Sequence, residues 1–282
     1  PSAQSPIETV PATRMELKDD PRLQTLNEQQ KVSYNLIVSA INQSTPGAPL
    51  RLMLHGAPGT GKTHLIRTVV DKLGEATLSC TAPHALAAAN MPGGRTLHNA
   101  AAVTIRGTLS KSKATVATAK QQIASAKCLV IDEISTLSSQ LAEAVDQRLR
   151  QWRDPEISWG GMHLVILGDV MQTESIGRSL LKAKPGTRAA SLFKEFDTII
   201  SLTDQMRAAE DQQWAQLLTE IRRPDIEHPV LHTKLLTIVK PLTAQDVRSE
   251  PGWATATIVT CTNTARHAIN QEQARRFSKI HG

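Results

Sequence analysis

The segment GAPGTGKT, residues 56–63, has the clearest chemical signature in the sequence. It matches G-x-x-x-x-G-K-[ST], a pattern whose bare glycines let backbone N–H groups approach phosphate oxygens. An apolar run before it predicts a strand and the residues after it predict a helix, which is the context that the pattern requires. We expect Lys62 to reach the β- and γ-phosphates of a nucleotide and Thr63 to ligate Mg²⁺. The residues expected to bind the nucleotide here are Gly56, Gly59, Thr60, Gly61, Lys62 and Thr63.

Two adjacent acids, Asp132 and Glu133, end the apolar run in KCLVIDE. Paired acids usually mark a solvated turn, but this pair directly follows four apolar residues and therefore stands at the end of a buried strand. Sheets of the α/β class bind their ligands at the carboxyl ends of strands. We expect Asp132 to hold Mg²⁺ and Glu133 to orient or deprotonate the attacking water.

A third apolar run, in MHLVILGD, ends at Gly168-Asp169, and Gln172 follows three residues later. A polar residue at a strand end beside a phosphate site is placed to read the γ-phosphate. A Gly-Asp turn after a strand is common, so this signal is weak alone. Together, the three strand ends predict a RecA-like core that hydrolyses a nucleotide.

The elements that must position these residues alternate along the chain. Helical spacing predicts a helix over 26–41, with Asn27 and Gln30 as its cap, and further helices over 63–74, 84–91, 135–153, 211–223 and 265–277. Strands are expected within 49–56, 76–83, 127–133, 162–169, 192–207 and 256–263. The strands are continuous apolar runs, which predicts an α/β fold with a parallel sheet covered by helices on both faces.

These elements divide the chain into expected domains. We expect a flexible segment over 1–24, a RecA-like ATPase domain over 25–200 and the start of a second RecA-like domain over 201–282. The stretch 104–119 is polar, basic and weakly patterned, which predicts a small hairpin or loop within an inserted element at about 104–126.

Composition limits the partners and the compartment. The net charge of +6 is compatible with a polyanionic partner without demonstrating one. Cys80, Cys128 and Cys261 lie far apart without a CxxC pattern, so we expect buried reduced thiols and an intracellular protein. Since no apolar run reaches the ~18 residues of a membrane span, no membrane partner is expected. Aromatic residues make up 3%, which argues against an extended base-stacking platform.

From about Leu26 to Asn270 the chain resembles the superfamily 1B DNA helicases of the Pif type (petite integration frequency), which are related to RecD. The resemblance rests on LNEQQ, GAPGTGKT, VIDEIS, GGRTLHNA, GDVMQ, LTDQMR and ATIVTCTNTARHAIN. It implies that Gln30 reads the adenine edge, that Gln172 couples nucleotide state to motion, and that Arg207 reaches the γ-phosphate across a domain cleft.

The same resemblance implies a path for single-stranded DNA. It assigns DNA contacts to Pro83, His84, Thr96, His98, Thr262 and Asn263. Two differences from the family pattern fall on that path. His84-Ala85 stands where the family usually has Thr-Gly, and Thr173-Glu174-Ser175 stands where it usually has Leu-Pro-Pro. Without the resemblance, we would expect His98 to make an ordinary polar contact.

The resemblance implies an ATP-dependent, Mg²⁺-requiring motor that moves 5′ to 3′ on single-stranded DNA, with duplex, forked or quadruplex DNA as candidate substrates. The family's later motifs are absent from these 282 residues, so we expect a fragment. We expect a monomer, in the nucleus or mitochondrion if the source is eukaryotic and otherwise in the cytoplasm. Two alternatives stay open: an AAA-type loader that does not unwind, and a non-catalytic nucleotide-binding module.

Overall fold

A computed structural model describes residues 21–43, 48–172, 178–207, 211–222, 228–238 and 262–281, together with residues 243, 245, 249, 256 and 258–260. The strands are β1 (Arg51–Gly56), β2 (Leu78–Ala82), β3 (Arg95–Thr96), β4 (Cys128–Ile131), β5 (His163–Gly168) and β6 (Thr198–Leu202). The helices are α1 (Glu28–Gln43), α2 (Lys62–Leu73), α3 (Ala85–Ala89), α4 (Leu97–Ala100), α5 (Lys113–Ile123), α6 (Ser139–Trp152), α7 (Arg188–Lys194), α8 (Gln212–Ile221), α9 (His228–Ile238) and α11 (Asn263–His281). Short 3₁₀ turns are η1 (Pro21–Thr25), η2 (Ile134–Thr136), η3 (Ser158–Gly161) and η4 (Leu180–Lys182).

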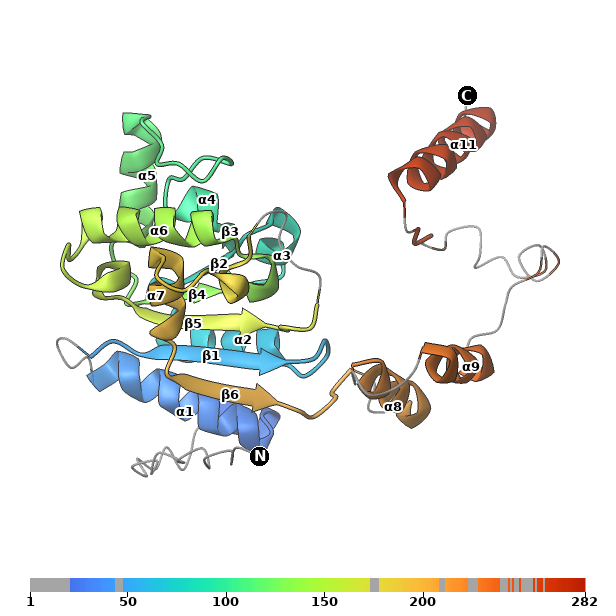
Figure 1. The fold of residues 1–282 in the computed structure, drawn as a ribbon, viewed down its shortest axis with the longest axis horizontal. Coiled ribbons are helices and arrows are strands. Elements are labelled where there is room, and N and C mark those ends of the chain that lie inside the picture. The colour runs from blue at the N-terminus through green and yellow to red at the C-terminus, as the bar shows by residue number, and fades with distance from the viewer. Residues whose placement is uncertain are drawn as a thin grey trace. The chain divides into compact units, whose positions relative to one another are not determined.

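The chain forms two compact units, residues 1–215 and 216–282. In the first unit, six strands form one sheet in the order β3-β2-β4-β5-β1-β6 (Figure 1). Neighbouring strands in this sheet pair in parallel, which confirms the predicted α/β fold. Because parallel strands all end on the same side, the sheet collects the loops that follow β1, β2, β4 and β5 at one edge.

Two apolar cores cover the two faces of the sheet. Alternate strand residues divide between them: Leu52, Leu54 and Val165 pack with α1 and α2, while Met53, Leu164 and Ile166 pack with α6 and α7. Strand side chains alternate between faces, so a strand buried on both sides reads as a continuous apolar run. Cys80 and Cys128 are buried in β2 and β4, as predicted, whereas Cys261 lies outside the described residues.

A buried aspartate fixes the turn that leads into β5. The Oδ1 atom of Asp146 accepts a 2.7 Å hydrogen bond from the backbone N–H of Trp159, whose side chain is fully buried. Trp159 has a φ of 57° in η3, a conformation that non-glycine residues adopt at a cost. The other carboxylate oxygen of Asp146 accepts two bonds from the half-exposed Arg188.

We predict that Asp146→Ala lowers the free energy of unfolding by about 1–3 kcal/mol, because it leaves the buried N–H of Trp159 without an acceptor. Arg188 keeps access to water and adds little to the loss. Asp154→Ala is the matched control, since Asp154 also accepts a backbone N–H bond, from Glu156, but at the surface. Urea unfolding measures both; equal losses in the two variants would contradict the role given to burial.

The structure corrects the prediction for 104–119. A narrow hairpin occupies only its first part, where Val103 and Leu109 form an isolated antiparallel bridge. The rest begins α5, whose N-cap is Ser112, accepting from the backbone N–H of Thr115. Only Ala119 and Ile123 of this helix are buried, so its apolar pattern was too sparse to recognise.

The predicted strand over 256–263 is also wrong for the residues that the structure describes. Residues 256, 258–260 and 262 belong to no strand, and Asn263 is the first residue of α11. Thr262 instead caps this helix, since its hydroxyl accepts from the N–H of Ala265. A strand needs a paired neighbour, and the described residues of the second unit include helices but no strand.

Some predictions lie outside the described residues: the flexible segment up to residue 20 and the Thr173-Glu174-Ser175 difference. The assignment of 201–282 to the start of a second RecA-like domain stays a prediction. Within the part of the chain that is described, no helix is both long enough and apolar enough to cross a bilayer.

Candidate functional site

The phosphate-binding pattern forms the loop between β1 and α2. Gly59 and Gly61 have φ values of +86° and +81°, a region that favours glycine. A Cβ on Gly56 would lie 2.6 Å from the Thr60 hydroxyl, and a Cβ on Gly61 would collide with Gln30. The loop therefore needs glycine for two reasons. Its backbone adopts positive φ angles, and neighbouring side chains occupy the space that a Cβ atom would need.

Lys62 lies across this loop. Its Nζ atom donates to the backbone carbonyls of Gly56 at 2.7 Å and Ala57 at 3.0 Å. Lys62 and Thr63 also open α2, so the positive end of the helix dipole faces the same space. A cation, a helix N-terminus and a glycine-rich backbone together favour a bound phosphate group.

The side chain of Gln30 hydrogen-bonds to the phosphate loop. Its side-chain Nε2 donates to the carbonyl of Thr60 at 3.1 Å, and its Oε1 accepts from the backbone N–H of Asn27 at 3.0 Å. The side chain of Asn27 in turn accepts from the N–H of Gln30, which confirms the predicted cap of α1. Gln30 is 1% exposed, so in this structure its amide supports the loop, and the adenine contact stays a prediction.

Asp132 and Glu133 follow β4 beside the loop. Burial raises the pKa of the Asp132 carboxyl above its usual range, an effect that a bond from the N–H of Glu133 and the charge of Lys62 oppose. Burial, followed by the charge of Asp132, also raises the pKa of Glu133. When both are ionised, the carboxylates of Asp132 and Glu133 carry more negative charge than the nearby positive charge balances. A divalent cation beside them would supply positive charge.

These residues fit Mg²⁺. The hydroxyl of Thr63 and the carboxylate of Asp132 are hard oxygen ligands, which this ion prefers. Among the described residues, no group of three or more His, Cys, Asp and Glu side chains is arranged to hold a metal. Mg²⁺ at phosphates needs no such cage, because it uses one or two protein ligands and completes its shell with water and phosphate oxygens.

Gly168, at the end of β5, lets the Asp132-Glu133 segment lie close to this strand. Its φ is +150°, and a Cβ there would lie 2.9 Å from both the backbone N and the Cγ2 of Ile134. Glu133 itself has a φ of 58°, which is unusual for a non-glycine residue. The packing against Gly168 helps to hold that conformation.

We predict that Gly168→Ala destabilises the protein by about 1–3 kcal/mol, because the added methyl group displaces Ile134 and with it Glu133. Gly74→Ala is the matched control: its φ is +85°, but nothing lies within 4 Å of the added Cβ. Urea unfolding compares the two variants. An equal loss of stability in Gly74→Ala would mean that backbone strain rather than the contact with Ile134 is the cause.

One cleft of about 500 Å³ brings most of the predicted nucleotide residues together, whereas Gln30, Gly56 and Thr60 do not line it. Its lining residues include Gly59, Gly61, Lys62, Thr63, Asp132, Glu133, Asp169, Gln172 and Arg207. Asp169 orders the turn that carries Gln172: its side chain accepts from the N–H of Met171 and its carbonyl from the N–H of Gln172. The cleft thus holds Lys62, Arg207, His64 and three acidic side chains beside a phosphate-binding backbone.

Arg207 reaches this cleft on the segment that follows β6. The backbone N–H groups of Met206 and Arg207 both lie within hydrogen-bond distance of the Gly59 carbonyl, at 2.9 and 3.3 Å. A Cβ on Gly59 would lie 2.9 Å from the Cβ of Arg207. Arg207 therefore stands directly beside the phosphate loop and within the first unit.

The residues expected to contact DNA divide between the two units. Pro83, His84, Thr96 and His98 belong to the first unit, and Thr262 and Asn263 to the second. His84 is exposed after β2, and Thr96 caps α4 by accepting from the N–H of Asn99. Burial, followed by the nearby His84, lowers the pKa of His98. Their contacts with DNA stay predictions.

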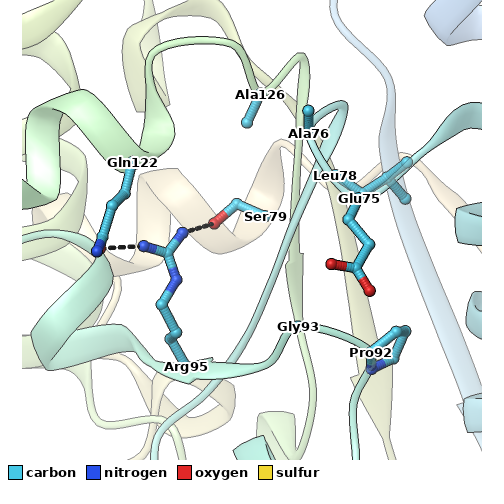
Figure 2. Close-up of a pocket in the computed structure, with 9 residues that line it drawn as sticks. All are labelled: Glu75, Ala76, Leu78, Ser79, Pro92, Gly93, Arg95, Gln122 and Ala126. Atoms are coloured by element: carbon cyan, nitrogen blue, oxygen red, sulfur yellow. Dashed lines mark hydrogen bonds between the residues drawn. The ribbon is translucent and has the colours of Figure 1, made fainter.

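A second cavity, of about 230 Å³, lies beside the edge strand β3 (Figure 2). Arg95 crosses it, with hydrogen bonds to Gln122 and, at 3.5 Å, to the hydroxyl of Ser79. None of the predicted nucleotide or DNA residues lines this cavity. The predicted nucleotide residues therefore gather at the larger cleft rather than at this cavity.

Sequence reasoning missed four residues that shape the cleft. Gln29 and Thr203 tie the start of α1 to the segment after β6, Met206 bonds to the loop, and Gly168 makes room for Ile134. The glycine was visible as part of GDVMQ, but its purpose required the fold. No sequence signal pairs Gln29 with Thr203, because 174 residues separate them.

Comparison with known proteins identifies relatives that match most of the first unit. The family model described as PIF1-like helicase matches residues 25–228. The ATP-dependent DNA helicase PIF7 of Trypanosoma brucei brucei is 29% identical over 196 residues, which cover 64% of this chain and 19% of that protein. The chain thus spans about a fifth of the length of that curated relative.

Solved structures share the fold. The crystal structure of Pif1 helicase from Candida albicans aligns with a TM-score of 0.69 and 22% identity, covering 91% of this chain and 55% of that one. Pif1 helicase from Bacteroides, solved in complex with ADP-AlF3 and ssDNA, aligns with a TM-score of 0.60 and 21% identity, covering 88% and 56%. At these identities the likeness establishes a shared fold.

Proposed function

The chain belongs to the PIF1-like helicase family, and we propose that its cleft binds and hydrolyses ATP as the motor part of a DNA helicase. The observation that carries this proposal is the single cleft that collects Lys62, Glu133, Gln172 and Arg207 around the phosphate loop. These residues come from four separate strand ends, which the parallel sheet places along one edge.

In the proposed mechanism the protein acts through charge and position. Lys62 and the helix dipole of α2 bind the phosphates, and Arg207 stabilises the charge that develops on the transferred phosphoryl group. Glu133 orients the attacking water and accepts its proton, for which its raised pKa is suited. Mg²⁺, held by Thr63 and Asp132, would supply further positive charge at the phosphates. Gln172 senses whether the γ-phosphate is present.

The proposed partner is single-stranded DNA, as in the Bacteroides relative. Movement from 5′ to 3′, and duplex, forked or quadruplex DNA as substrates, follow from the family and are proposals, since this chain spans only part of the length of its relatives. Pro83, His84, Thr96 and His98 are the proposed DNA contacts of the first unit, and Thr262 and Asn263 those of the second. We propose a monomer, in the nucleus or mitochondrion if the source is eukaryotic.

Steady-state ATP hydrolysis with and without single-stranded DNA tests the proposal. Turnover that DNA stimulates is the expected result. Turnover that DNA leaves unchanged would count against coupling to DNA, and ATP binding without any turnover would favour a non-catalytic module. Duplexes with a 5′ or a 3′ single-stranded tail then test polarity in any chain that turns over.

A further inference from the structure

A short arm, residues 203–207, runs from the end of β6 past the phosphate loop and carries Arg207. Its first two residues are bonded to the start of α1. The N–H of Thr203 donates to the side-chain Oε1 of Gln29 at 2.9 Å, and the Nε2 of Gln29 donates to the hydroxyl of Thr203 at 3.0 Å. Asn27 adds a bond of 2.9 Å to the carboxylate of Asp204. The arm is therefore fastened before it reaches the loop.

The last two residues of the arm are bonded to the loop itself. The N–H groups of Met206 and Arg207 share the carbonyl of Gly59. Between these two fastenings lies Gln205, whose side-chain oxygen would be 2.9 Å from a Cβ on Gly59. With both ends held, the backbone of Arg207 has little freedom to move relative to the phosphate loop.

Two adjacent residues in the first turn of α1 thus hydrogen-bond to two different segments, the phosphate loop and the arm. Gln30 bonds to the loop carbonyl of Thr60, whereas Gln29 bonds to the arm. A hydrogen bond at the surface contributes little to overall stability. Gln29, however, uses both ends of its amide on one residue, which fixes an orientation as well as a distance.

We propose that Gln29 is a positioning residue for Arg207, which it acts on through Thr203 and the arm. The proposal rests on the proposed function, in which Arg207 stabilises the transferred phosphoryl group. Gln29 itself is not among the residues that line the cleft. Its loss therefore affects turnover only to the extent that Arg207 moves.

Hydrogen exchange tests the positioning step without requiring turnover. In Gln29→Leu, which removes the amide at nearly constant volume, the amides of Thr203 and Met206 are expected to exchange about three- to tenfold faster, the effect of losing one or two hydrogen bonds. Lys31→Ala is the control, because Lys31 pairs with the exposed Glu28 on the same helix. Unchanged exchange of the arm in Gln29→Leu would overturn the proposal.

Two variants of Thr203 test the same contact in case Gln29→Leu does not fold. Thr203→Val removes the hydroxyl that Gln29 contacts, whereas Thr203→Ser keeps it. Faster exchange at Met206 is expected in the valine variant and wild-type exchange in the serine variant. Equal exchange in the two variants would contradict a role for the Gln29 contact.

Kinetics test the link to Arg207. Gln29→Leu is expected to lower kcat by about three- to tenfold with KM for ATP nearly unchanged, because ground-state binding does not depend on Arg207. In an Arg207→Ala background, Gln29→Leu is expected to have no further effect on kcat. An additive loss in the double variant would overturn the proposal, since Gln29 would then act by another route.

The two proposals fail in different ways. Absence of ATP turnover in the wild type counts against the proposed function, and the exchange experiment still decides whether Gln29 holds the arm. Turnover that depends on Arg207 but not on Gln29 leaves the proposed function intact and removes the role given to Gln29.

Discussion

Glu133→Gln is expected to lower kcat for ATP hydrolysis by about 10²- to 10⁴-fold while ATP still binds. The carboxylate lies in the cleft beside Lys62 and Asp169, and its raised pKa makes it a better proton acceptor than an exposed glutamate. Glutamine keeps the size of the side chain and its hydrogen-bonding capacity but cannot accept the proton of the attacking water. Removal of one negative charge also lowers repulsion of the phosphates, so affinity for ATP is expected to hold or rise.

The control for this prediction is Glu28→Gln, which makes the same change at an exposed carboxylate of α1. Equilibrium binding of ATP and single-turnover hydrolysis separate the two steps. If Glu133→Gln hydrolysed ATP at the wild-type rate, a different residue would act as the base. If it failed to bind ATP, the carboxylate would be needed to maintain the site.

Lys62→Ala is expected to weaken ATP binding by about 100-fold or more, because it removes the ammonium group that we propose binds the β- and γ-phosphates. In the structure the Lys62 ammonium already lies in that space, bonded to the carbonyls of Gly56 and Ala57. Phosphate oxygens are stronger partners for it than those neutral carbonyls. Since α2 begins at Lys62, alanine preserves the helix, and the fold is expected to remain intact.

Lys72→Ala makes the same change at the exposed, opposite end of α2 and is the control. Fluorescence titration with a labelled ATP analogue measures the affinity, and the thermal midpoint checks the fold. Wild-type affinity in Lys62→Ala would mean that the phosphates bind elsewhere. An equal loss in both variants would point to general electrostatics rather than to the loop.

The strand ends explain why much of the site could be predicted from the sequence. Lys62, Glu133 and Gln172 each follow an apolar run closely, and parallel strands place such ends along one edge. The order of strands and helices along the chain was therefore enough to predict that these residues share one cleft. The cap formed by Asn27 and Gln30 was equally local, since both partners lie in one turn.

The remaining features depend on contacts between distant parts of the chain. The fastening of Thr203 by Gln29 and the bond from Met206 to Gly59 join segments that no periodicity connects. The helix α5 was missed because two buried residues suffice to hold it. The strand expected over 256–263 was predicted from its β-branched residues. These residues favour a strand but cannot form one without a neighbouring strand to pair with.

Single-turnover hydrolysis of ATP, with protein in excess and single-stranded DNA present or absent, tests the central claim most directly. If the cleft around Lys62, Glu133 and Arg207 is a DNA-stimulated hydrolytic site, ATP will be cleaved faster with DNA than without it. Glu133→Gln will slow the same reaction by about 10²- to 10⁴-fold. ATP that is bound but never cleaved, or cleaved equally well by Glu133→Gln, would contradict the claim.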